Sequence, residues 1–267
     1  MRPQRRIFRS VSPVVTSLPL ALVLVFAVPS PARALGDWVG VEGNVWRQNQ
    51  DGSASIDGSV TGTTFDFQNT LDLEKSDSSK MGRVWFKMGK VRLIFDYLDS
   101  SREGSKTLTQ SFLFNDTPYV ATEDVDSSLD LKLMQAQVRF TLADLKVVDV
   151  GVGIGLNQAQ INMVMDGSIS GRTTLDEKVP YPTLAAAVTI KPFPGFHIRA
   201  EASGLKVNIS GTRVNVLDAR LQIEAYVAHV LGFFAGYRTY RLDVDDQNFG
   251  SVENTFKGPY AGIGLKF

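Results

Sequence analysis

The residues Asn215 to His229, NVLDARLQIEAYVAH, alternate strictly between apolar and polar side chains. In a β-strand the apolar residues would share one face, and the opposite face would carry the charges of Asp218, Arg220 and Glu224. A soluble β-sandwich would bury the apolar face and expose the charged one. A transmembrane β-barrel would turn the apolar face to lipid and the charged face to the lumen. The segment alone fits both architectures.

The connections between such segments favour the barrel. The chain contains ten segments with a period of two residues, at 37–47, 81–88, 91–101, 128–142, 147–165, 179–191, 196–209, 215–229, 233–244 and 256–267. Short connections (89–90, 143–146, 192–195, 230–232) alternate with longer polar ones (48–80, 102–127, 166–178, 245–255), and only 210–214 departs from this order. Short turns on one rim and longer loops on the other are typical of an up-and-down barrel, which must close because hydrocarbon cannot satisfy a free strand edge. We therefore predict an all-β protein, a closed antiparallel up-and-down transmembrane β-barrel of about ten strands.

Two segments change phase toward the longer loops. The apolar series Val148 to Leu156 is followed by Ala159 and Ile161, which fall on the other face, and a similar change follows Ala202. A β-bulge moves the side chains by one position, so we predict a bulge, with Gly204 as one site. A wrong register in these segments is the alternative. The segment FDFQNTLDLEKS, 65–76, is predicted either to add strand beyond the membrane or to fold inward as a plug.

The N-terminus has the features of a secretory signal peptide. RPQRR precedes the apolar run Val14 to Val28, and the small-residue sequence Ala32-Arg33-Ala34 follows it, which predicts cleavage after Ala34. An N-terminal membrane anchor is the alternative. Removing 1–34 takes away five arginines and no acid, so 23 basic residues remain against 28 acidic ones, and the net charge of −5 argues against nucleic-acid binding. The remainder, 35–267, is predicted to be one barrel domain that folds without cysteine.

The C-terminal sequence YAGIGLKF places apolar side chains at alternate positions and ends on phenylalanine. With the ten alternating segments and the signal peptide, it resembles the bacterial outer-membrane β-barrel superfamily. In that superfamily such an ending is the signal that the barrel assembly machinery recognises, carried here by Ala261, Ile263, Leu265 and Phe267. The resemblance implies export to the outer membrane of a Gram-negative cell and contact with outer-membrane lipid and lipopolysaccharide. It carries over no functional residue, because no site motif matches.

The face opposite the apolar one supplies the predicted lumen. Its principal charged candidates are Arg83, Arg92, Asp96, Arg139, Arg199, Glu201, Arg220, Glu224 and Arg238. Basic residues outnumber acids in this set, so the first hypothesis is a narrow or gated pore with a preference for anions. The alternative is a structural or surface-interaction barrel whose lumen is closed by ion pairs and whose loops contact lipopolysaccharide or a partner protein. Full pairing of these charges across the strands would favour the alternative, and a continuous wet gap the pore. Ten strands are too few for a wide porin.

Catalysis, a metal and a cofactor are not predicted. The two histidines, His197 and His229, lie beside short turns and hence at the inner rim, away from any outer-leaflet or external substrate. Acidic groups in the longer loops, such as Glu123 and Asp245, could bind a divalent cation, although solvated loop acids are the favoured interpretation.

Overall fold

The structure is a computed structural model that describes residues 38–56, 63–209, 211–246 and 250–267, all within the unit Leu35–Phe267. The predicted signal peptide, 1–34, lies outside these residues. Within the described ranges, no helix is long and apolar enough to cross a bilayer.

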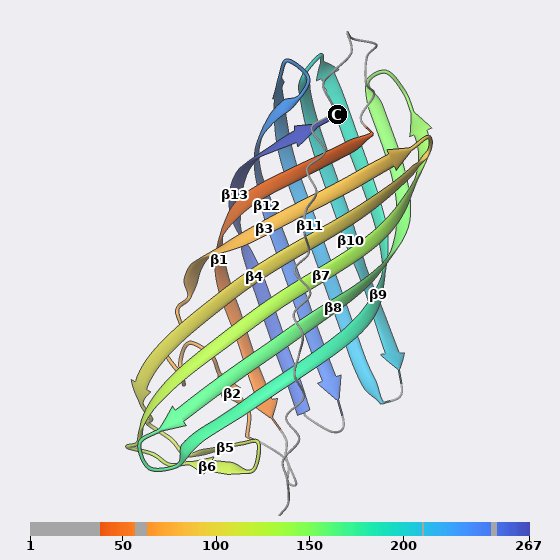
Figure 1. Cartoon of the computed structure of the whole chain (residues 1–267). Helices are drawn as coiled ribbons and strands as arrows, with labels where there is room; N and C mark the ends of the chain where they lie inside the picture. Colours follow the sequence, from red (N-terminus) through yellow and green to blue (C-terminus); the bar gives the residue numbers. More distant parts are fainter. Residues whose placement is uncertain (1–37, 57–62, 210, 247–249) are drawn as a thin grey trace, which may run out of the picture. The chain divides into compact units, whose positions relative to one another are not determined.

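Ten long strands form one antiparallel sheet that closes on itself, because β13 pairs with both β12 and β1 (Figure 1). The strands of the barrel are β1 (Val39–Ile56), β3 (Ser76–Met88), β4 (Val91–Thr107), β7 (Asp124–Asp144), β8 (Val148–Gly167), β9 (Gly171–Phe193), β10 (Phe196–Ile209), β11 (Thr212–Val227), β12 (Leu231–Asp246) and β13 (Gly250–Lys266). Three short strands lie between them: β2 (Phe65–Asp66), β5 (Phe112–Phe114) and β6 (Thr117–Tyr119). The predicted fold class is confirmed.

The short turns and both ends of the barrel sequence lie at one rim. The Phe267 amide donates to the Val39 carbonyl at 2.8 Å, and the Phe267 carbonyl accepts from the Trp38 amide at 2.8 Å. Two of the turns at this rim use glycines with positive φ, Gly89 at 60° and Gly195 at 80°, a backbone region that glycine enters without steric cost. We call this end the short-turn rim.

Several connections predicted as long loops are largely strand. The connection between β8 and β9 is only 168–170, and the one between β12 and β13 is only 247–249. The strands β7, β8 and β9 contain 21, 20 and 23 residues, about twice the 9–11 that cross a bilayer. The loop prediction was wrong at 166–178 and 245–255 because these strand ends have polar outward faces, so no apolar outward pattern marks them.

The predicted β-bulges were also wrong. Gly204 pairs in register with Leu217, and β8 pairs with β9 without interruption from Val148 to Gly167. Register shifts occur instead near the short-turn rim, between Thr141 and Ala143 and between Phe196 and Ile198. The side chains of each strand therefore continue to alternate between inward and outward along its whole length. What changes along the strand is which of the two faces is apolar and which is polar.

This exchange of chemistry divides the barrel into two zones. On β8, the outward residues are apolar up to Leu156 and polar from Gln158 except for Val164, while the inward residues become apolar from Ala159. On β11, the outward change from Leu217 to Asn215 accompanies the inward change from Asp218 to Val216, and β10 and β12 change in the same way. The strands β1, β3 and β4 also turn polar outward, but they keep buried polar side chains inside the distal zone, among them Gln48, Ser79 and Arg102. We call the part with apolar outward residues the lipid-facing zone, and the part beyond it the distal zone.

The interior of the distal zone is an apolar core that includes Leu98, Leu131, Ile161, Leu242 and Phe256, each at most 5% exposed. Residues 63–75 and 108–123, here called the cap, fold over this core at the end opposite the short-turn rim (Figure 1).

The cap contributes aromatic side chains to the core. The Phe65 ring centroid lies 5.1 Å from that of Phe112, which stacks on Tyr119 at 5.6 Å. The cap approaches β4 at Gly104, where a Cβ would lie 2.6 Å from the Leu71 carbonyl oxygen, so a larger residue would displace the cap. Both proposals for 65–76 are thus realised: β2 pairs with β1, and the side chains fold inward.

Candidate functional site

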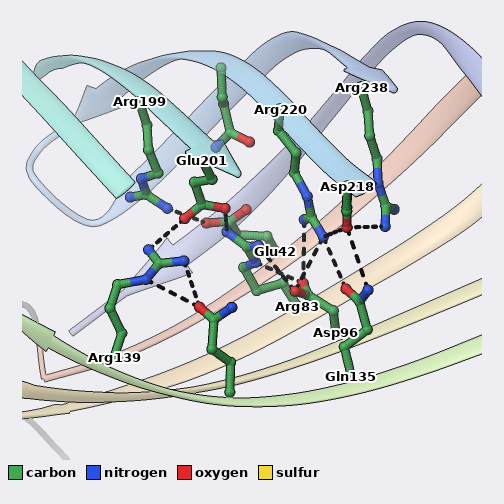
Figure 2. A network of polar contacts seen from close by, with 12 residues as sticks. Glu42, Arg83, Asp96, Gln135, Arg139, Arg199, Glu201, Asp218, Arg220 and Arg238 are labelled. Carbon is green, nitrogen blue, oxygen red and sulfur yellow. Dashed lines mark hydrogen bonds and ion pairs between the residues drawn. The ribbon is translucent and has the colours of Figure 1, made fainter. Parts of the chain in front are cut away.

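The interior of the lipid-facing zone is filled by charged side chains that meet across the lumen (Figure 2). Five arginines and five acids make up this charged layer: Glu42, Arg83, Asp96, Arg139, Arg199, Glu201, Asp218, Arg220, Glu224 and Arg238. Several of its ion pairs join strands that are not neighbours in the sheet, such as Arg83 of β3 with Glu201 of β10. Such contacts are possible only through the interior of the barrel.

Arg83 and Glu201 are at the centre of the charged layer. Arg83 donates to both carboxylate oxygens of Asp96, Nε at 2.7 Å and Nη2 at 3.0 Å, and its Nη1 lies 2.8 Å from Glu201. Glu201 also accepts from Arg139 Nη1 at 2.7 Å, and Arg139 Nη2 donates to the side-chain oxygen Oε1 of Gln137 at 2.7 Å. Bidentate and shared pairs of this kind satisfy most of the donors of each guanidinium, which a dry interior requires.

A second group of ion pairs lies on β11 and β12. Arg238 makes a bidentate pair with Asp218, at 2.9 Å from Nε and 2.8 Å from Nη2. Arg220 lies 3.3 Å from both Asp218 and Asp96, and so connects this group to the Arg83 group across the lumen. Both Arg238 and Asp218 are 3% exposed, so the pair is shielded from water.

Toward the short-turn rim, Glu224 accepts from four side chains. Arg199 lies 2.9 Å away, the Tyr226 hydroxyl donates at 2.8 Å, Gln222 donates at 3.2 Å, and His197 Nδ1 is at 3.4 Å. Arg199 also reaches toward Glu42 at 3.7 Å. Every member of the charged layer therefore has at least one partner of opposite charge.

The structure places eight of the nine predicted lumen candidates in the charged layer. The ninth, Arg92, lies nearer the short-turn rim, with its guanidinium carbon 4.6 Å from the centroid of the Trp85 ring. The principal lumen candidates did not include Asp218, although the period of two places it with Arg220 and Glu224 on the charged face of 215–229. With Asp218 and Glu42 included, the charged layer has no net charge, and the numerical excess of basic residues that suggested anion preference disappears.

Little space remains inside the barrel. Two cavities within the charged layer have volumes of about 10 and 20 Å³, room for about one water molecule each. A cavity of about 20 Å³ in the distal core is lined by apolar side chains such as Phe67, Leu131 and Ile161. None of these three cavities is wide enough for a hydrated ion.

The remaining predicted residues lie away from the lumen. Ala261, Ile263, Leu265 and Phe267 point outward on β13, and Ile263 is 58% exposed; their role in assembly stays a prediction. Of the histidines, His197 contacts Glu224, and His229 lies exposed in the turn after β11. Both are at the short-turn rim.

Glu123 has a structural role in the cap instead of a ligand-binding one. Its carboxylate accepts from the Ser170 amide and hydroxyl, the Val120 amide and the Ile169 amide, which ties the cap to the turn between β8 and β9. Burial would raise its pKa, but these hydrogen bonds favour the carboxylate and lower the pKa to about 2. Among the residues that the structure describes, no cluster of three His, Asp or Glu could hold a metal ion.

These features define a class: a closed β-barrel with the fold of bacterial outer-membrane proteins and a blocked lumen. Among solved structures, the outer membrane protease OmpT from Escherichia coli matches with a TM-score of 0.58 and 10% identity, over 86% of this chain and 97% of that one. The translocator domain of the autotransporter NalP from Neisseria meningitidis matches with a TM-score of 0.45 and 14% identity, over 87% and 89%. The fold assignment rests on the match to OmpT. An identity of 10% shows a shared fold and nothing about activity. The resemblance to the outer-membrane β-barrel superfamily is confirmed at that level. Neither models of protein families nor curated proteins match the chain.

Proposed function

We propose that the chain is a non-conducting outer-membrane barrel that anchors its distal zone at the cell surface as a folded interaction module. The observation that carries this proposal is the charged layer, in which five arginines and five acids pair inside the lumen, some between neighbouring strands and some across it. This is the arrangement expected of a structural or surface-interaction barrel.

Opening the charged layer would be energetically costly. Removing one partner of a buried ion pair typically destabilises a protein by about 3–5 kcal/mol, because the other charge is left uncompensated. Arg83, Glu201 and Arg220 each contact two or more partners, so a passage would require several pairs to separate together. The pore hypothesis would need such a rearrangement.

The distal core is a second obstacle to conduction. An ion that crossed the charged layer would meet apolar side chains such as Leu131 and Phe256, and beyond them the aromatic cluster of the cap. A dry apolar constriction excludes ions because it cannot replace their hydration. Blockage by two chemically different barriers supports a permanently closed lumen over a pore with one gate.

Catalysis is not part of the proposal. OmpT is a protease by its name, but a fold shared at 10% identity transfers no activity. Both histidines of this chain lie at the short-turn rim, where a substrate arriving from outside the cell would not meet them.

The cellular route follows the sequence-based expectation. We propose export through cleavage after Ala34, insertion by the barrel assembly machinery and residence in the outer membrane, with lipid or lipopolysaccharide as the surrounding partner. Recovery of the protein in the soluble periplasm without detergent would contradict this route.

Conductance in a planar bilayer tests the closed lumen. Residues 35–267, refolded in detergent with folding checked by a heat-dependent electrophoretic shift, are expected to give no reproducible current steps. Reproducible steps that change in ion selectivity when Arg220 or Arg238 is replaced by glutamine would contradict the proposal and restore the pore hypothesis. The matched control is Arg241→Gln, which removes an arginine from the outside of the same barrel.

A further inference from the structure

The outward-facing charges of the barrel follow a pattern of their own. Going along each strand from the short-turn rim toward the distal zone, the first charged residue on the outward face is basic in eight of the ten strands and acidic only in β4 and β8. The whole chain holds equal numbers of basic and acidic residues, 28 of each, so this bias does not reflect composition.

Five of these basic residues form one side of the barrel. They take part in none of the ion pairs found among the described residues, and they are Arg47 of β1, Lys80 of β3, Lys132 of β7, Lys178 of β9 and Lys206 of β10. We call this set the basic arc. Its strands are consecutive in the sheet apart from β4 and β8, which lie between them.

The centre of the basic arc is a continuous row across five strands. Lys80 pairs in register with Asp99, Asp99 with Lys132, Lys132 with Gln160, and Gln160 with Lys178. Three lysines and one aspartate give this row a net charge of +2. Registered neighbours in a sheet are about 5 Å apart, so the lysines can reach one polyvalent anion or two anions side by side.

On the other side of the barrel, the equivalent basic residues are neutralised by acids. The pairs are Arg213 with Asp245 at 3.6 Å, Arg241 with Asp243 at 2.9 Å, and Lys257 with Asp51 at 3.5 Å. The five basic residues of the arc therefore keep their charge for a ligand, whereas the three on the other side are neutralised by acids of the protein.

The basic arc lies directly beside the apolar outward residues of the lipid-facing zone, which are here called the apolar band. Val45 is 55% exposed and precedes Arg47 on the outward face of β1, and Met134 is 49% exposed and adjoins Lys132 on β7. A lipid whose acyl chains cover this band would hold its headgroup at the level of the arc. Further out, the next outward charges include acids such as Asp130 and Asp176, so Asp99 is the one acid within the row itself.

We propose that the basic arc binds the phosphate groups of a phosphorylated lipid in the outer leaflet, with Lys80, Lys132 and Lys178 as its centre. This proposal rests on the outer-membrane placement in the proposed function, but not on the closed lumen. The alkyl stems of the lysines lie along the apolar band while their ammonium groups reach the phosphates. Charge attraction and acyl burial then act at the same place, which selects a lipid over a soluble anion.

The test compares two triple variants of residues 35–267 refolded into phosphatidylcholine vesicles. The first is Lys80→Gln with Lys132→Gln and Lys178→Gln; the matched control is Arg213→Gln with Arg241→Gln and Lys257→Gln. Both triple variants remove three positive charges from the outward face of the barrel, near the level where the lipid-facing zone meets the distal zone. The probe is lipid A, a diphosphorylated acylated disaccharide, and its retention by the extracted protein is counted by native mass spectrometry.

We expect the arc variant to bind lipid A about a hundredfold more weakly than the parent, since each of the three basic residues near an anionic surface contributes about a fivefold effect. The control should change affinity by less than about threefold. A lysine-to-arginine triple at the arc positions should retain binding, which separates loss of charge from loss of folding. Equal losses in both glutamine triples, or none in either, would overturn the proposal.

Two further arms identify the ligand source. Millimolar inorganic phosphate should not displace lipid A; displacement would mean an anion site without lipid selection. Current steps in the bilayer assay with lipid A binding intact would contradict the closed lumen but not the lipid site at the basic arc. Recovery of the protein as a soluble species would contradict the outer-membrane placement on which both proposals rest.

Discussion

The two zones of the barrel are built from the same strands but in opposite ways. In the lipid-facing zone of β8, Ile154 points outward and is 64% exposed, while the glycines opposite it leave room for the charged layer. A few residues further along, Asn162 points outward and Ile161 is buried in the distal core. The strand alternates without a break, so the medium outside the barrel decides what the inside contains.

This difference follows from the solvation of each face. Lipid requires an apolar outer surface, so the polar residues of the lipid-facing zone lie inside, where they must pair. Water around the distal zone accepts polar residues, so its apolar residues gather inside, as in a soluble protein. The interior of the barrel is therefore filled by paired charges in the lipid-facing zone and by apolar packing in the distal zone.

The largest expected effect is the loss of a buried charge in the lipid-facing zone. Asp218→Ala leaves Arg238 without its bidentate partner and should lower the free energy of unfolding by about 3–5 kcal/mol. Urea-induced unfolding from detergent micelles, followed by tryptophan fluorescence, measures it. The control is Asp243→Ala, whose partner Arg241 is half exposed, with an expected loss of about 0–1 kcal/mol. Similar losses in both variants would show that the charged layer is hydrated.

A matched pair of leucines separates the two interiors. Leu131→Ala removes a buried side chain of the distal core, 4% exposed, and should cost about 2–5 kcal/mol. Leu184 is 60% exposed on the outward face of the lipid-facing zone, where lipid fills the space that alanine leaves, so Leu184→Ala should cost about 1 kcal/mol or less. The same unfolding assay applies, and a reversed order would mean that the distal core is loosely packed.

Inserting one charge on one face of β8 should locate the boundary between the zones. Ile154→Lys places an ammonium group against lipid and should cost about 2–4 kcal/mol, whereas Asn162→Lys, on the same outward face of the distal zone, should change stability by less than about 0.5 kcal/mol. Folding equilibria in vesicles measure both. Equal costs would place lipid around Asn162 as well.

The most local expected effect is the response of the cap to acid. Because hydrogen bonding lowers the folded-state pKa of Glu123 to about 2 from 4.5, its contribution is complete above about pH 4.5 and is lost as the pH falls through 2. Hydrogen exchange in the cap, 108–123, should therefore accelerate between pH 4.5 and 2 beyond the intrinsic rate change. Glu123→Gln should exchange faster at neutral pH and lose this dependence. An unchanged profile in the variant would show that other groups hold the cap.

The alternation of apolar and polar residues was enough to predict the closed ten-stranded barrel and most of the charged layer. It failed where the faces exchange chemistry, because a change of phase at Ala159 looks the same whether the chain bulges or the surrounding medium changes. The sequence also could not show which charged side chains pair with one another. Arg83 meets Glu201 only because the barrel closes with a particular stagger between its strands. The cap had no periodic signal, since Phe65 and Phe114 pack by tertiary contact from short segments.

The central claim is that the strands leave the lipid where their two faces exchange chemistry. The chain contains no cysteine, so single cysteines can be introduced on the outward face of β8 at 152, 154, 156, 158, 160 and 162 and labelled with a fluorophore. In vesicles of brominated phosphatidylcholine, we predict strong quenching at 152–156, a decline at 158 and quenching near the aqueous background at 160 and 162. Strong quenching that continued to 162 would place the distal zone inside the bilayer and contradict the account.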